Sequence, residues 1–271
     1  ICNPSSKHLE VAIPLVESGV HLLIEKPVSS NSEDVNKLIT LSKKSNSKIL
    51  VGYNLKFLGS LITFKEEINK GSIGEVLSIR AEVGQHLGSW RTDKNYLNSV
   101  SARKELGGGV LLELSHEFDY LKWIFGKIKW VFGYTTKISS LEVDVEDLSH
   151  SLVCFKKIKN KKNVVASITQ DFFRRDTVRN CLVIGEEGSL RWDGINNSVE
   201  IYRSSEEIWS TVYKEKISRD YSYKQQLLHF IECITKDASP LTSVESALET
   251  IYLIEGIKRS SIEKRPFPIK I

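Results

Sequence analysis

The sequence HLLIEKP at residues 21–27 decides the fold, because an apolar run ends there in a carboxylate, an ammonium group and a proline. Residues 20–24 are typical of a buried strand, and Pro27 ends it because proline lacks an N–H and fixes its own φ angle. In an open α/β sheet, ligands bind outside the carboxyl ends of the strands. Taken alone, the stretch fits a strand that finishes in solvated charges better than a binding site, so the rest of the chain has to decide.

Strand and helix patterns alternate on both sides of this stretch, over residues 1–54. Residues 1–4 are typical of the end of a strand, and the apolar spacing that follows predicts a helix that ends at Gly19. A second helix is predicted after Asn31 or Ser32, either of which can cap it, and another strand over residues 48–51. This alternation is the pattern of an α/β fold with a doubly wound parallel sheet, so we expect part of a Rossmann domain over residues 1–54.

Residues 55–271 are richer in strand patterns and are expected to form a second domain. A helix over residues 60–70 precedes a strand at 76–83 and a polar, aromatic loop at 85–102, and one continuous helix is predicted after Gly107–Gly109. Further strands are predicted at 129–137, 149–156, 163–173, 179–184, 189–192, 198–203 and 266–271, and helices at 223–235 and 243–263. We therefore expect an α+β domain with a large, mostly antiparallel open sheet and helices on one face.

Composition narrows the class of protein. The 271 residues are 41% hydrophobic and 27% charged with a formal net charge of +4, a surplus too small and too scattered to indicate nucleic-acid binding. No apolar run approaches the length of a membrane span. The four cysteines form no close pair, so neither a zinc site nor a disulfide framework is indicated. We expect a cytoplasmic protein with reduced thiols that binds neither nucleic acid nor membrane.

Glu113, His116 and Asp119 are spaced by three, which would place them on one side of the predicted helix. Two carboxylates beside an imidazole can orient its tautomer and tune it as a general acid and base. In isolation the pattern is more often a helix with ordinary acidic residues and one hydrogen-bonded core histidine. A metal site is also conceivable at this spacing, but no further His or Cys cluster supports one, so we expect no metal.

Two other motifs can each be interpreted in two ways. Trp90-Arg91 combines a flat apolar face with a cationic fork that suits sugar rings and phosphates, or it is a surface cation–π pair. The triple glycine at 107–109 lets the backbone come close to a ligand or a sheet, or it is a flexible turn.

The order of these motifs along the chain is more specific than any one of them, and it resembles the Gfo/Idh/MocA oxidoreductase family over nearly all 271 residues. The motifs are Asn-Pro at 3–4, His8, Gly-Val-His at 19–21, Glu-Lys-Pro at 25–27, Gly-Tyr-Asn at 52–54, the stretch 71–76, Trp-Arg at 90–91 and the run 105–116. The resemblance implies an N-terminal Rossmann domain and a C-terminal α/β domain with a large open sheet.

The resemblance also implies an enzyme that transfers a hydride between NAD or NADP and a hydroxyl-bearing carbon of a sugar, nucleotide-sugar or cyclitol. In this family pattern His116 takes or returns the hydroxyl proton, Lys26 polarises the oxygen, and Glu113 orients His116 or binds another hydroxyl. The residues implied on the cofactor side are Asn3, Pro4, His8, Glu25, Lys26, Pro27 and Asn54. Those implied on the substrate side are Lys56, Trp90, Arg91 and Asp119. A homo-oligomer, dimer or tetramer, is expected because a large sheet with one uncovered face must hide it.

Three departures from the family pattern matter. The glycine-rich loop that binds the dinucleotide pyrophosphate is absent, and the chain holds no Met, so we expect a piece of a longer gene product with roughly seventy residues upstream. Glu113 precedes His116 by three residues where the family has an Asp four residues earlier, which turns the acid by about 100° on an ideal helix. Lys56 stands where the family has an arginine, and it lacks the planar fork.

Two alternatives to the enzyme remain at this point. The same fold can bind a dinucleotide or a sugar without turnover, as a regulatory protein. The chain could also be an inactive truncated fragment, because without the phosphate-binding loop it should bind the cofactor poorly.

Overall fold

The computed structural model describes residues 1–90, 95–156 and 163–269. The first region is a small α/β unit with η1 (Ser5–Lys7), α1 (His8–Glu17), β1 (Leu22–Ile24), α2 (Val35–Ser45) and β2 (Ile49–Val51). β1 and β2 pair in parallel, with Leu22 opposite Ile49. Ile1 continues this pairing on the other edge of β1, since its amino group donates to the Leu23 carbonyl at 2.7 Å and its carbonyl accepts from the Glu25 N–H at 2.9 Å. The predicted parallel arrangement is confirmed.

Helix α2 begins later than the sequence predicts, because its two expected capping residues have other partners. The Ser32 N–H and hydroxyl both donate to the carboxylate of Glu255, at 2.7 and 2.9 Å. The Asn31 side chain accepts from the Glu33 N–H, and Asp34 has a positive φ of 59°. These contacts form a turn over residues 31–34, so the first helical residue is Val35.

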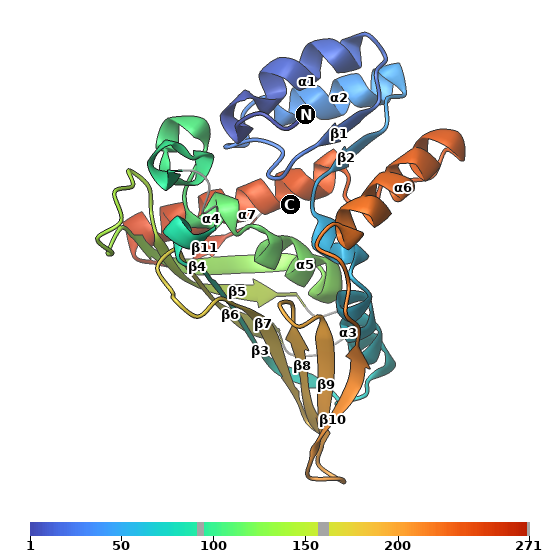
Figure 1. Ribbon diagram of the computed structural model, residues 1–271, viewed down its shortest axis with the longest axis vertical. Helices are drawn as coiled ribbons and strands as arrows, with labels where there is room; N and C mark the ends of the chain where they lie inside the picture. The colour runs from blue at the N-terminus through green and yellow to red at the C-terminus, as the bar shows by residue number, and fades with distance from the viewer. Residues whose placement is uncertain (91–94, 157–162, 270–271) are drawn as a thin grey trace.

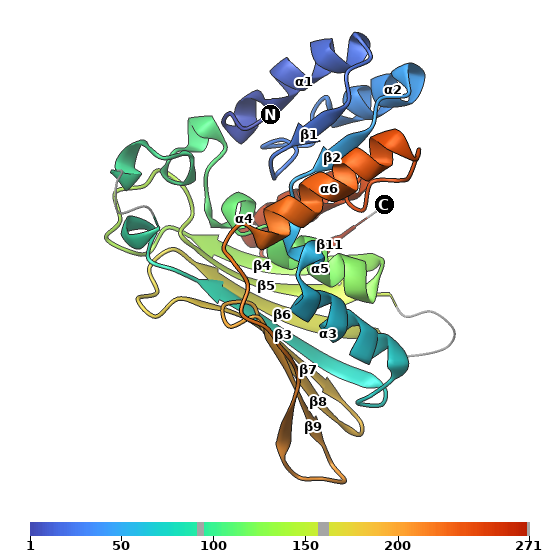
Figure 2. The same ribbon diagram turned by 45° about the vertical axis from the view of Figure 1, so that its right-hand side comes forward.

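The second region is built on one sheet of nine strands in the order β10-β9-β8-β7-β3-β6-β5-β4-β11 (Figures 1 and 2). Every neighbouring pair is antiparallel except β3 and β6, which run parallel. The strands are β3 (Val76–Gly84), β4 (Ile128–Thr136), β5 (Leu148–Phe155), β6 (Val164–Asp171), β7 (Val178–Gly185), β8 (Gly188–Asp193), β9 (Ser198–Arg203), β10 (Trp209–Lys214) and β11 (Phe267–Pro268). The large, mostly antiparallel sheet is thus confirmed. The sequence prediction missed β10, an edge strand with largely exposed side chains.

Helices cover one face of this sheet and connect it to the first region. They are α3 (Gly59–Lys70), α4 (Val110–Glu113), α5 (His116–Phe125), α6 (Tyr221–Thr235) and α7 (Val244–Glu263). α3, α5 and α7 lie on the same side of the sheet, and α6 runs beside β2 (Figures 1 and 2). α7 is buried along its length because it contacts β4 of the large sheet on one side and α2 and β2 on the other.

The predicted continuous helix after the triple glycine is wrong, because the chain breaks into α4 and α5 at Leu114 and Ser115. Leu114 has φ −99° and ψ 28°, outside the helical region. The Gln170 side chain donates to the Leu114 carbonyl at 2.7 Å, and the Tyr53 hydroxyl donates to the Ser115 hydroxyl at 3.1 Å. The bond from Gln170 satisfies the Leu114 carbonyl, which an unbroken helix would have paired internally. Glu113 therefore ends one helix and His116 begins the next.

The triple glycine is a place where the chain packs closely against itself. A Cβ atom on Gly107 would lie 2.1 Å from the Ser5 hydroxyl, and one on Gly108 would lie 2.2 Å from the Val100 carbonyl. Gly107 and Gly109 also have positive φ angles of 83° and 109°. Of the two sequence interpretations, close approach is correct, but the neighbour is the protein's own backbone and side chains.

Candidate functional site

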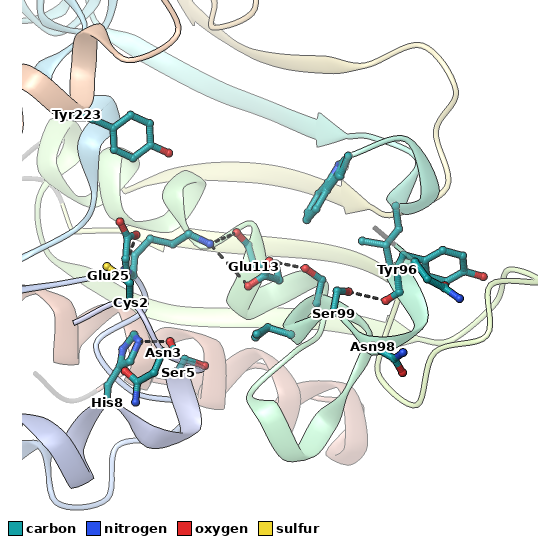
Figure 3. A pocket seen from close by; sticks show the side chains of 16 residues that line it. Cys2, Asn3, Ser5, His8, Glu25, Tyr96, Asn98, Ser99, Glu113 and Tyr223 are labelled. Atoms are coloured by element: carbon teal, nitrogen blue, oxygen red, sulfur yellow. Dashed lines mark hydrogen bonds and ion pairs between the residues drawn. The ribbon is translucent and has the colours of Figure 1, made fainter. Parts of the chain in front are cut away.

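A cavity of about 750 Å³ lies where the first region meets the loop before α4. One wall comes from the first region and carries Cys2, Asn3, His8 and Glu25; Figure 3 shows these side chains together on one side of the cavity. The opposite wall comes from the short 3₁₀ helices η4 (Tyr96–Asn98) and η5 (Val100–Ala102). Most of its side chains are neutral and polar or aromatic, namely Asn95, Tyr96, Asn98, Ser99 and Ser101, and Val100 adds an apolar one.

Lys26 and Glu113 meet between these walls. The Lys26 ammonium donates to the Glu113 backbone carbonyl at 2.7 Å and lies 3.8 Å from a carboxylate oxygen of the same residue. The other carboxylate oxygen accepts from the Ser101 hydroxyl at 2.6 Å. Figure 3 shows Glu113 at the centre of the cavity lining, with these contacts dashed. The break between α4 and α5 makes this contact possible, because it ends α4 with Glu113 turned toward Lys26.

A second, smaller cavity of about 220 Å³ adjoins this contact and holds His116. Lys26, Trp90 and Glu113 line both cavities, so they form the boundary between the cofactor-side wall and the histidine. The His116 ring packs edge-on against Tyr53 with 5.4 Å between ring centroids. The sequence prediction that brings Lys26, Glu113 and His116 to one place thus agrees with the geometry, although Glu113 and His116 do not share a helix.

His116 is suited to accept a proton. Burial is the main cause that lowers its pKa well below the ordinary value of 6.5, and the positive charges of Arg179, Lys26 and Lys56 lower it further. The imidazole is therefore neutral at pH 7. Its buried Nδ1 atom has no hydrogen-bond partner among the described residues.

His8 holds the cofactor-side wall together. Its Nδ1 lies 2.9 Å from the Pro27 carbonyl and its Nε2 lies 2.9 Å from the Asn3 carbonyl. Burial is the main cause that lowers its pKa below the ordinary value of 6.5. Because His8 joins residues before α1 to those after β1, it fixes the position of Asn3 and of the turn after Lys26.

Several predicted site residues line neither cavity. Lys56 and Asp119, expected on the substrate side, form a buried ion pair at 2.9 Å with only 2% of each side chain exposed. Asn54, expected on the cofactor side, is buried and donates to the Ser222 hydroxyl at 3.0 Å. Pro4 and Pro27 are also absent from both linings, and Arg91 lies outside the described residues.

Sequence reasoning missed Glu117 and Arg179, which form an ion pair at 2.9 Å beside His116. Glu117 follows His116 directly in the sequence, and this position was the one local sign that Glu117 could belong to the site. Arg179 comes from β7, 62 residues away, and nothing local in the sequence indicates the pairing.

Among the described residues, no His, Cys, Asp and Glu side chains gather in groups of three or more that could hold a metal ion. None of the helices in this part of the chain combines the length and apolar character needed to cross a membrane.

Comparison with known proteins places this geometry in a family. The model of the oxidoreductase family's C-terminal α/β domain matches residues 65–271, and the model of its NAD-binding Rossmann fold matches residues 1–53. The chain belongs to the Gfo/Idh/MocA oxidoreductase family. The resemblance seen in the sequence is thereby confirmed.

Relatives within the Gfo/Idh/MocA family are distant but match over long stretches. Oxidoreductase P35 of Formosa agariphila is 24% identical over 205 residues, which is 75% of this chain and 61% of that protein, so the match spans less than two thirds of it. Myo-inositol 2-dehydrogenase of Thermotoga maritima is 22% identical over 98% of this chain and 77% of its own length. The solved structure of levoglucosan dehydrogenase in complex with NADH superposes with a TM-score of 0.86, at 20% identity, over all of this chain and 79% of its own. This superposition shows the fold.

Proposed function

We propose that the protein is an NAD- or NADP-dependent dehydrogenase that acts on a hydroxyl-bearing carbon of a sugar, nucleotide-sugar or cyclitol. The observation that carries the proposal is the position of Lys26. It lies on the boundary between a wall that suits the nicotinamide end of a cofactor and a cavity that holds a neutral histidine. In a dehydrogenase, the substrate hydroxyl must contact both a cation and a base.

The residues on the first wall fit one end of a dinucleotide. Asn3 has a buried side-chain oxygen without a partner among the described residues, which can accept from an amide such as the nicotinamide carboxamide. Asn3, His8, Glu25 and Lys26 would hold this end of the cofactor. The cofactor, when bound, supplies acceptance and donation of the hydride. The pyrophosphate-binding glycine loop is not among these 271 residues.

His116 and Lys26 have separate roles at the substrate hydroxyl: one transfers its proton and the other stabilises its negative charge. The neutral imidazole takes the hydroxyl proton as the carbon is oxidised and returns it in the reverse direction. The Lys26 ammonium stabilises the negative charge that develops on the oxygen. Only 17% of the Lys26 side chain is exposed, and electrostatic interactions are stronger in such a partly buried site than in bulk solvent.

Glu113 has a different role from the one suggested by its spacing. Its carboxylate contacts Ser101 and Lys26, and no hydrogen bond joins it to His116. We therefore assign it the positioning of Lys26. Lys56 acts from the interior, because it is buried in an ion pair with Asp119 and its charge helps to lower the pKa of His116.

Other features support the wider assignment. Relatives carry the names myo-inositol 2-dehydrogenase and levoglucosan dehydrogenase, which are enzymes of a cyclitol and of a sugar. The neutral, polar wall from Asn95 to Ser101 suits a polyhydroxylated ligand. The helices lie on one face of the large sheet, which supports a homo-oligomer, dimer or tetramer, that covers the other face (Figure 2). We also place the protein in the cytoplasm, on its cysteine usage.

The test is NADH and NADPH absorbance on a panel of sugars, nucleotide-sugars and cyclitols, with the gene product that contains these residues. Lys26→Ala and His116→Ala are compared with the matched surface changes Lys7→Ala and His150→Ala, which lie outside both cavities. Turnover that falls at least about a hundredfold in the first two variants alone supports both roles. Cofactor binding without turnover across the panel would instead favour the regulatory protein, and absence of binding the inactive fragment.

A further inference from the structure

Arg179 and Glu117 form an ion pair at the edge of the small cavity. The Arg179 Nε donates to one carboxylate oxygen of Glu117 at 2.9 Å. Glu117 is completely buried, whereas 19% of the Arg179 side chain is exposed. Arg179 lines the cavity that also holds His116, Lys26 and Gln85. The pair thus presents a guanidinium group to the same space as the proposed catalytic residues.

The guanidinium has donors left over. A guanidinium carries five N–H groups, and Glu117 receives one of them. Neither terminal nitrogen of Arg179 bonds to another residue of the described chain, while the Nε bond fixes the plane of the group. A partly exposed planar fork with free donors, held by a buried carboxylate, is arranged to bind oxygen atoms that enter the cavity.

We propose that Arg179 is a substrate-binding residue that binds a second oxygen of the substrate, on a carbon next to the one that reacts, and that Glu117 positions it. This inference rests on the proposed function, because it uses the same site. Lys26 and His116 contact the reacting hydroxyl, and Arg179 donates hydrogen bonds to the oxygen on the neighbouring carbon. The substrate class that follows is a compound with vicinal oxygens, such as a cyclitol or a pyranose with adjacent free hydroxyls.

The size of the cavity supports a compact group at this position. Its volume of about 220 Å³ accommodates part of one sugar ring. Trp90 lines it as well, and its flat ring face is suited to the C–H face of such a ring. Gln85 adds an amide that can donate to or accept from a hydroxyl.

A purely structural role for Arg179 is the competing explanation. A buried carboxylate requires a partner, and Arg179 supplies one whether or not it touches substrate. The two roles differ in what the variants do. Loss of a structural partner weakens the whole fold and the binding of every ligand alike, whereas loss of a substrate contact weakens only ligands that carry the second oxygen.

The experiment measures ligand dissociation constants by calorimetry, with cofactor present, for myo-inositol, D-glucose and their mono-deoxy analogues. The proteins are the parent, Arg179→Gln, Arg179→Lys, Glu117→Gln and the control Arg174→Gln. Arg174 pairs with Glu82 and Asp176 and lines neither cavity. Thermal unfolding of each variant reports whether it is folded.

We expect Arg179→Gln to weaken the hydroxylated ligand about tenfold to a hundredfold and to remove the preference over one deoxy analogue. Arg179→Lys should keep part of that preference, because the charge remains without the fork. Glu117→Gln should lose less, since an amide oxygen still accepts from Nε. Arg174→Gln should match the parent.

Three results would overturn the inference. Arg179→Gln could bind like the parent, or it could lose affinity equally for all analogues, which indicates a structural role. The parent could also fail to prefer any hydroxylated ligand over its deoxy analogues. Turnover is scored separately, so a parent that binds these ligands selectively without oxidising them would refute the dehydrogenase and leave the Arg179 contact standing.

Discussion

Removal of Asp119 should destabilise the fold through the charge it leaves behind. Lys56 and Asp119 are 2.9 Å apart and each is 2% exposed. With an effective dielectric constant of about 20, Coulomb's law gives an attraction of about 6 kcal/mol at that distance. Desolvation of the two ions offsets much of this gain in the intact pair, but Asp119→Leu keeps the cost for Lys56 and loses the attraction. We expect the free energy of unfolding to fall by about 3–5 kcal/mol.

The double variant Lys56→Met/Asp119→Leu distinguishes this account from simple loss of packing. It removes both charges and fills the space with apolar groups, so its stability should return to within about 1–2 kcal/mol of the parent. Equilibrium unfolding in urea measures all three proteins, with Glu232→Gln as a surface control that should change little because the Lys236–Glu232 pair is exposed. Costs that simply add in the double variant would refute the reasoning.

Three further outcomes follow from glycine packing and from buried histidines. Gly108→Ala should cost about 1–3 kcal/mol and exceed Gly88→Ala in a thermal scan, because a Cβ would meet the Val100 carbonyl at 2.2 Å, whereas the nearest neighbour at Gly88 is the His86 side chain at 3.2 Å. Similar melting temperatures would contradict the close approach. The acidic limb of kcat/KM for oxidation should lie below pH 6.5, because the pKa of His116 is lowered in the folded protein and the neutral imidazole is the base; a limb above 6.5 would exclude that role. Since the pKa values of His8 and His116 are both lowered by folding, the unfolded chain binds more protons below pH 6.5, and stability should fall as pH drops through that range. His8→Gln should flatten this dependence in urea titrations, and an unchanged slope would count against it.

The sequence predicted those parts of the fold that depend on local pattern. The alternation around residues 21–27 indicated the parallel unit, and the strand patterns from 76 onward indicated the antiparallel sheet; both are confirmed. The break at Leu114 was not predictable, because an apolar run with helical spacing carries no local sign of it. The break depends on the bond from Gln170, which lies 56 residues away.

The candidate site was predictable to the extent that its residues stand in recognisable motifs. Lys26, Glu113 and His116 come together as expected. Lys56 and Asp119 line neither cavity, and only the packing reveals that each has the other as its partner. Arg179 carries no motif, and its contact with Glu117 arises from the position of β7 in the sheet.

The contact between Lys26 and Glu113 has a consequence for how the protein folds. It joins residues 87 positions apart, and other contacts between the regions span more, with 102 positions from Ser5 to Gly107 and 223 from Ser32 to Glu255. Contacts of high sequence separation form late and slowly, because loop-closure entropy is lost before they are gained. The ammonium group is therefore aligned with the imidazole only once contacts of this length have formed, and the large sheet itself depends on such contacts, because β3 pairs with β6 across 87 positions. We expect a chain whose first 54 residues are not docked to leave Lys26 away from Glu113, even where its large sheet has formed.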